Sequence, residues 1–253
     1  MKKLFFPMLL FVSMVSLLLV SCSGKKPVRQ DVFDPKAVLQ QASKFIEMDE
    51  YEEARKLLFE VKNRDLSKKY APLAQLKIAE SFVTEGQPER AVEEYRRFLQ
   101  LYPEHPQAPY AQYQIALVYF KQIESPEKGA GGARKALEEF QKLLRLYPRN
   151  PYREAVELKI RKCRNLIAEY EFLVGEFYYK KGSYNAAIGR FLGLLKEFPG
   201  YKKTPEVLYL TGISYKELNR TEESLRYLKE LQKRFPESEF SKKAEKVISE
   251  IKP

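Results

Sequence analysis

The sequence contains few of the residues that build metal centres and β-rich folds. Among 253 residues there is no tryptophan, one histidine, two cysteines and 11 glycines. So few histidines and cysteines leave almost no ligands for a zinc or iron–sulfur centre. The shortage of turn glycines argues against a β-sandwich or barrel, while 31% charged residues favour a helical protein. Hydrophobic residues reach 44% and aromatics 13%, which is enough to bury a core and excludes wholesale disorder.

The first cysteine closes an amino-terminal apolar segment. The chain starts with Lys2 and Lys3, continues with an apolar run, and reaches Leu19-Val20-Ser21-Cys22. A basic start, a short apolar stretch and small residues at its end are typical of a secretory signal, and this ending resembles the bacterial lipobox. We expect residues 1–21 to be a lipoprotein signal peptide and Cys22 to be lipidated with acyl chains such as palmitate. The alternative interpretation is a membrane-spanning anchor of about 17 residues.

Cleavage before Cys22 would make this cysteine the first residue of the mature chain. Residues 22–34 are polar, include Pro27 and show no periodicity, so we expect a lipidated cysteine followed by a flexible tether. By resemblance to known lipoprotein sorting, Ser23 after the cysteine indicates the periplasmic face of the outer membrane. The net charge would fall from +11 to +9, since Lys2 and Lys3 are lost. Cys163 would remain as a lone thiol, and its place on a helical pattern predicts a small core residue.

From residue 35 onward one spacing recurs five times. A small residue is followed four positions later by a large apolar one, and in the last four copies proline stands twelve positions after the small residue. Upstream, a second small residue precedes an aromatic by three positions, as in Ala79 and Phe82. This pattern predicts two closely packed helices, A and B, and a proline stop, and it resembles the tetratricopeptide repeat. The five pairs in helix B are Ala54–Leu58, Ala91–Tyr95, Ala136–Phe140, Ala187–Phe191 and Ser224–Leu228.

Two insertions interrupt the regular spacing. The third copy gains a Pro- and Gly-rich loop over 122–132, and the fourth gains 14 residues, almost four helical turns, before its small residue. A helix therefore runs from about Tyr152 to Lys181. We expect an all-α tetratricopeptide-repeat superhelix over 35–253, with five helix pairs, one elongated helix opening the fourth repeat and a capping helix. The expected repeats are 35–66, 70–103, 107–148, 152–199 and 202–236, and the expected cap is 237–251.

These features together resemble the BamD family, the tetratricopeptide lipoproteins of the outer-membrane β-barrel assembly machinery. The resemblance rests on the length anomalies, the lipobox and two stretches, Ala136 to Tyr152 and Ala168 to Pro199. It implies a periplasmic scaffold that binds a BamA-like barrel-assembly protein and unfolded outer-membrane precursors. It also implies that Arg190, in helix B of the fourth repeat, contacts the barrel-assembly partner. The alternative function is that of a tetratricopeptide lipoprotein acting as a pilus or secretin pilotin, or as an envelope-division coordinator.

The sequence offers little to an enzyme or a nucleic-acid binder. His105 stands alone in a Pro-rich turn, where a solvated loop residue is expected, and none of G-x-S-x-G, P-loop, H-E-x-x-H or C-x-x-C is present. Acidic pairs fall early in helix B, where they complement the helix dipole. Basic residues are interleaved with glutamates rather than clustered. We expect no catalysis, cofactor, metal, small-molecule substrate or nucleic-acid partner.

Register along helix A predicts which residues could meet a client polypeptide. Positions six and three before the small residue, and one and four after it, are expected to line a groove. The groove is expected to be more apolar in its amino-terminal half and more charged in its carboxyl-terminal half. The alternative is that some of these side chains pack against the next repeat. The candidates are Leu73, Leu76, Tyr110, Tyr113, Leu117 and Phe120.

Overall fold

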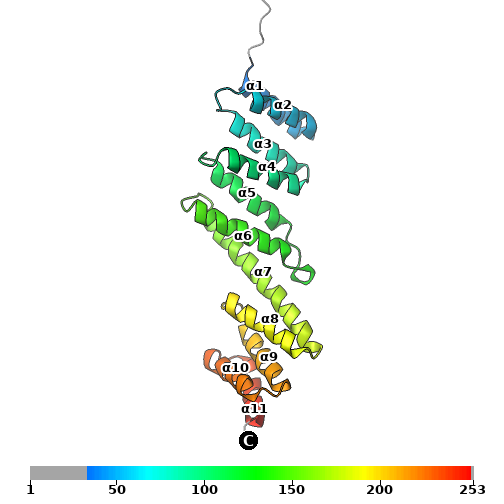
Figure 1. Cartoon of the computed structure of the whole chain (residues 1–253), viewed down its shortest axis with the longest axis vertical. Helices are drawn as coiled ribbons and strands as arrows, with labels where there is room; N and C mark the ends of the chain where they lie inside the picture. The colour runs from blue at the N-terminus through cyan, green and yellow to red at the C-terminus, as the bar shows by residue number, and fades with distance from the viewer. Residues whose placement is uncertain (1–32, 252–253) are drawn as a thin grey trace, which may run out of the picture. The chain divides into compact units, whose positions relative to one another are not determined.

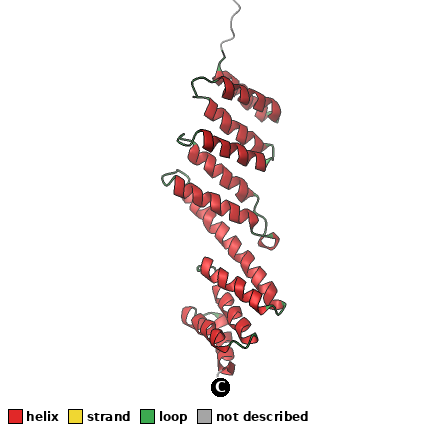
Figure 2. Ribbon diagram, in the orientation of Figure 1, coloured by secondary structure: helices red, strands yellow, loops and turns green. Residues whose placement is uncertain are grey.

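The computed structural model describes residues 33–251. In that range the chain forms eleven α-helices and one short 3₁₀ turn, joined by loops, as Figure 2 shows. The chain divides at residue 34, and every helix belongs to the second unit, 35–253. Residues 1–32, with the expected signal peptide and Cys22, lie outside the described residues.

Ten of these helices form five consecutive pairs, each an A helix followed by a B helix (Figure 1). An eleventh helix, α11 (Glu239–Ile251), packs against the last pair as the expected cap. The five-pair, all-α tetratricopeptide fold is therefore confirmed. The pairs are α1 (Pro35–Glu47) with α2 (Tyr51–Arg64), α3 (Ala71–Thr84) with α4 (Pro88–Leu101), α5 (Ala108–Lys121) with α6 (Gly131–Leu146), α7 (Arg153–Lys180) with α8 (Tyr184–Glu197), and α9 (Thr204–Glu217) with α10 (Thr221–Arg234).

Small residues set the distance between the two helices of a pair. All five small residues of helix B are 0% exposed, and the large residues four positions later are at most 1% exposed. The fit is closest in the last two pairs, where glycine stands on helix A. A Cβ added to Gly175 would lie 2.5 Å from the Phe191 ring, and one added to Gly212 would lie 2.6 Å from Leu228. Because real Cβ contacts are not that short, a larger residue at either position would force the facing side chain to move.

Four of the five A helices end in a turn that needs left-handed backbone. Residues at the same place in four repeats have positive φ: Asp49 (61°), Gly86 (79°), Gly182 (75°) and Asn219 (58°). Glycine, asparagine and aspartate adopt this conformation most readily, and it closes the end of a helix. The third repeat departs from this arrangement, because its turn is replaced by the insertion that contains the 3₁₀ turn η1 (Pro126–Lys128). This turn packs against α7.

The elongated helix α7 has 28 residues, as the insertion predicts. It contacts α6 on one side and α8 on the other, and it also contacts η1 and α9 (Figure 1). Its buried residues include Val156 and Cys163 in the first half and Phe172 and Gly175 in the second. One helix therefore serves as a packing surface for the third repeat and as helix A of the fourth.

Candidate functional site

The A-helix face of the second and third repeats is half-buried rather than open. Five of the six groove candidates keep partial exposure: Leu73, Tyr110, Tyr113, Leu117 and Phe120. The sixth, Leu76, is only 3% exposed. This side chain packs almost wholly within the core, so the expectation that Leu76 lines an open groove is wrong.

The reason is that the position three before the small residue contacts the next repeat. Tyr113 stacks on Tyr152 with ring centroids 4.4 Å apart and planes only 1° from parallel. Its equivalent in the fourth repeat, Phe172, packs on Tyr201 with centroids 6.2 Å apart. In the fifth repeat Tyr209 packs on Phe240 at 5.7 Å. Side chains at this position therefore pack between consecutive repeats. For Tyr113, only the ring face that is not stacked on Tyr152 could line a groove.

The other two aromatic candidates, Tyr110 and Phe120, contact polar or charged side chains at the surface. Tyr110 donates a hydrogen bond to Glu80 Oε1 at 2.7 Å, and burial together with this carboxylate raises the pKa of the Tyr110 hydroxyl. The Phe120 ring lies edge-on to Phe140, with the ammonium groups of Lys159 and Lys162 5.7 and 5.3 Å from its centroid. Long lysine side chains are flexible, so they can swing off this ring.

The corresponding face of the fourth and fifth repeats carries ion pairs. Glu169 accepts hydrogen bonds from Lys203 Nζ at 2.6 Å and from the Tyr201 hydroxyl at 2.8 Å. Burial alone would raise the pKa of the Glu169 carboxyl, but the two hydrogen bonds and the lysine charges outweigh it and lower the pKa. At the next step along the face, Lys216 pairs with Glu250 at 3.1 Å.

Arg190 lies on α8 in an ion-pair cluster that joins three helices. Its Nη1 is 3.0 Å from Glu171 Oε2 on α7, and the other oxygen of Glu171 accepts a hydrogen bond from Arg134 on α6. The Glu171 side chain is 13% exposed, whereas Arg190 is 45% exposed. A guanidinium has five N–H donors in a planar fork, so Arg190 keeps donors for a second carboxylate. Its predicted role at a partner interface stays a prediction.

His105 and Cys163 both lie in packed surroundings, as structural residues do. His105 is half-buried, its ring lies edge-on to Phe98 with centroids 5.6 Å apart, and its Nδ1 accepts a hydrogen bond from the Gln107 amide. It is thus more enclosed than the solvated loop residue expected. Cys163 is a free thiol with 0% exposure, and burial raises its pKa to about 11. Such a thiol is protonated at neutral pH and is a core residue, as predicted.

Two negative observations apply to residues 33–251. None of the helices described there is both long and apolar enough to cross a membrane. Over the same range, no group of three or more His, Cys, Asp or Glu side chains gathers where a metal ion could bind.

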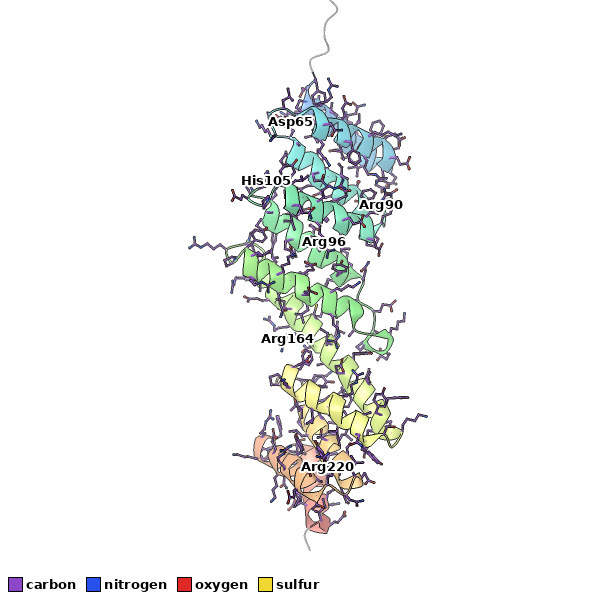
Figure 3. All side chains as sticks on the ribbon, in the orientation of Figure 1. Asp65, Arg90, Arg96, His105, Arg164 and Arg220 are labelled. Carbon is purple, nitrogen blue, oxygen red and sulfur yellow. The ribbon has the colours of Figure 1, made fainter. Side chains whose placement is uncertain are left out.

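Two surface cavities at the ends of B helices were missed by the sequence analysis. The first, of about 770 Å³, lies between the turns that follow α2 and α4, and Asp65 and His105 in its lining come from these two turns (Figure 3). The second, of about 510 Å³, lies between α4, α5 and α6. Their linings correspond across one repeat, since Lys62, Leu66 and Leu101 of the first match Leu99, Pro103 and Leu146 of the second. The signal that could have found them is the spacing of the small residues, which is 37 positions from Ala54 to Ala91 and 45 from Ala91 to Ala136.

The paired helices, their small–large contacts and the left-handed turns define a tetratricopeptide-repeat protein. The family model described as "YfiO: Outer membrane lipoprotein" matches residues 33–223. The chain therefore belongs to this family, the BamD family of outer membrane lipoproteins.

Individual relatives are distant in sequence. The outer membrane protein assembly factor BamD of Rickettsia prowazekii is 25% identical over 235 residues, covering 92% of this chain and 93% of that protein. The BamD of Caulobacter vibrioides is 29% identical over 136 residues, covering 54% of this chain and only 45% of that protein. Among solved structures, the P58(IPK) TPR domain is 16% identical, with a TM-score of 0.42, 86% of this chain covered and 56% of that chain. Because a TM-score of 0.42 is low, the fold is assigned from the helix packing and not from this structural match.

Proposed function

We propose that this protein is a non-catalytic assembly factor of the outer membrane. In this role it binds a BamA-like barrel-assembly protein and unfolded β-barrel precursors, and a lipid on Cys22 holds it at the periplasmic face. The observation that carries the proposal is membership of the BamD family over residues 33–223, together with relatives named as outer membrane protein assembly factors.

The apolar A-helix face of the second and third repeats suits the precursor role. An unfolded barrel strand alternates apolar and polar side chains, so one of its faces is apolar while it waits for insertion. Leu73, Leu117 and Phe120 are half-buried apolar side chains on this face. Tyr110 adds a hydroxyl that donates to Glu80 and can still accept a hydrogen bond from a backbone N–H.

The charged fourth and fifth repeats suit a folded partner. Arg190 is nearly half exposed and has unused donors, which is the chemistry that recognises a carboxylate on another protein. Electrostatic contacts of this kind fix the register of an interface.

A pull-down separates this function from the pilotin alternative. The full lipidated chain, extracted from its own membrane with mild detergent, should retain the outer-membrane barrel-assembly protein, identified by mass spectrometry. Retrieval of a secretin in place of the barrel-assembly protein would overturn the proposal.

The lipid anchor has its own test. Because three acyl chains contribute about 0.8 kcal/mol for each buried CH₂ group, they hold a domain firmly on a bilayer. The Cys22→Ala protein should lose palmitate labelling and leave the outer-membrane fraction. An unsubstituted protein that incorporates no labelled palmitate contradicts the anchor.

A further inference from the structure

The second repeat contains a complete hydrogen-bond network beside its cavity. Gln75, 0% exposed on α3, donates from Nε2 to the Glu94 backbone oxygen at 3.0 Å and to Glu94 Oε2 at 2.7 Å. Its carbonyl oxygen accepts a hydrogen bond from Lys62 Nζ on α2 at 2.6 Å. Every polar atom of this buried amide is therefore engaged.

The third repeat contains the same network with one donor missing. Gln112 on α5, also 0% exposed, donates to the Glu139 backbone oxygen at 3.3 Å and to Glu139 Oε2 at 2.7 Å. The residue equivalent to Lys62 is Leu99, which cannot donate. As a result Gln112 Oε1 has no hydrogen-bond partner in the described part of the chain.

Reversing the Gln112 amide does not remove the problem. Its oxygen would then face the Glu139 carboxylate, which is also an acceptor, and the favourable contact at 2.7 Å would become a repulsion. A buried acceptor without a partner destabilises the folded state, so such groups usually have one.

The unsatisfied glutamine lines the cavity between α4, α5 and α6, whereas Gln75 does not line the equivalent cavity one repeat earlier. In the earlier cavity Lys62 occupies this place. The rest of the lining in the third repeat combines apolar and basic side chains. Its other members are Leu99, Pro103, Leu146 and Tyr147, with Gln100, Arg96 and Lys142.

The charges around this cavity select the kind of donor that fits. Glu139 is already paired with Arg96 at 2.9 Å, and none of the described carboxylates pairs with Lys142 (Figure 3 labels Arg96). The remaining charge is positive, so among free ligands it favours a neutral N–H donor accompanied by an anion over a cation. A backbone amide flanked by an acidic side chain meets both conditions.

We propose that this cavity is a binding site for an extended polypeptide segment with alternating acidic and apolar side chains. One backbone N–H of the segment donates to Gln112 Oε1, an apolar side chain lies among Leu99, Leu146 and Tyr147, and a carboxylate contacts Lys142. The volume of about 510 Å³ is within the range of about 300–1,000 Å³ that holds a ligand group. Leu146 is 52% exposed, so the site opens to solvent along one edge. This site is separate from the A-helix face of the proposed function.

The Leu99→Lys variant tests the site because it copies the arrangement around Lys62. The probe is a fluorescein-labelled hexapeptide of alternating aspartate and phenylalanine, acetylated and amidated at its ends, titrated against the full chain in detergent by fluorescence anisotropy. The new lysine should satisfy Gln112 Oε1 from within, raising the melting temperature and weakening peptide binding at least tenfold despite its added positive charge. The matched control, Leu99→Met, keeps the apolar wall without a donor and should bind within about twofold of the unsubstituted protein.

The outcomes distinguish a peptide-binding site from a cavity in which water alone meets Gln112 Oε1. A higher melting temperature in Leu99→Lys with no peptide binding to the unsubstituted protein would mean that water alone fills the cavity, and the proposal fails. Equal binding of a hexapeptide with lysine in place of aspartate would also overturn it. Neither result affects retrieval of the barrel-assembly protein, so this proposal and the proposed function fail independently.

Discussion

The first three repeats and the last two differ in the chemistry that they present. On α3 and α5 the A-helix face is mostly apolar and aromatic, and the B-helix ends line cavities in which Leu101 and Leu146 are 53% and 52% exposed. On α7 to α11 the same face carries the Glu169–Lys203 pair, and the Glu171 cluster joins three helices. The small–large contact that forms each helix pair is the same in both regions. In the proposed function, this constant core with a variable surface is what would let one repeat type bind an unfolded chain in one region and a folded partner in the other.

The largest expected effect tests the core that both regions share. Phe191→Ala removes a ring that is 0% exposed and fills the space against Gly175. The free energy of unfolding should fall by about 3–5 kcal/mol, measured by urea denaturation. The control is Phe177→Ala on the neighbouring helix α7, where the ring is 56% exposed and the change should be within about 0.5 kcal/mol. Equal losses in the two variants would show that the small–large contact does not dominate the stability of this pair.

The second effect probes the charged region. Arg190→Glu should weaken binding to the purified barrel-assembly partner by about 2 kcal/mol or more, because an attraction between charges becomes a repulsion. The same change places a carboxylate beside Glu171, so Glu171→Gln is the matched control: it breaks the internal pair and leaves Arg190 in place. Calorimetry should find partner affinity nearly unchanged in Glu171→Gln. An equal loss in both variants would assign the effect to the internal cluster and not to the interface.

A smaller effect is expected on the apolar face. Leu117→Ala should weaken binding of a barrel-precursor peptide by about 1 kcal/mol, roughly fivefold, and lower the melting temperature less than Phe191→Ala, because Leu117 is only partly buried against the core. Tyr113→Ala should mainly lower the melting temperature, since the stack on Tyr152 is lost. Peptide affinity that is unaffected by Leu117→Ala would exclude this face as the client site.

The smallest effect is a pH dependence in the charged region. Because the pKa of folded Glu169 lies below its ordinary value of 4.5, this carboxylate adds stability above pH 4.5 and loses it as the pH falls further. Lys203→Met removes the main charged partner and should lower the free energy of unfolding by about 0.5–1 kcal/mol at pH 7. The difference between the two proteins should shrink towards pH 3 in urea denaturation. A difference independent of pH would assign the loss to packing of Lys203 over the Phe172 ring, 4.4 Å away.

The spacing of the small residues was sufficient to predict the helix pairs, because these positions leave little room for a larger side chain. Ala136 and Ala187 are fully buried under a neighbouring helix, so the spacing to Phe140 and Phe191 records the contact directly. The elongated helix was predictable for a similar reason, since 14 residues keep its faces in register.

The surface was less predictable because side chains on one face of a helix can have different neighbours. Leu76 and Leu117 share the A-helix face, yet Leu76 is buried and Leu117 is half-buried. The unsatisfied oxygen of Gln112 was also hidden, because it depends on what stands 13 residues earlier on another helix. Such a difference emerges only when equivalent residues of two repeats are compared in space.

The long helix α7 also has a consequence for how the protein unfolds. Repeat arrays often unfold by fraying, one unit at a time, since each unit contacts only its neighbours. Here the third and fourth repeats are connected by the segment 147–152, but the single 28-residue helix α7 that follows it packs on both α6 and α8. Unfolding either neighbouring repeat would therefore remove part of the packing of one continuous helix. Native-state hydrogen exchange should therefore find the slowest amides in the middle of α7, and fraying from either end should stop there.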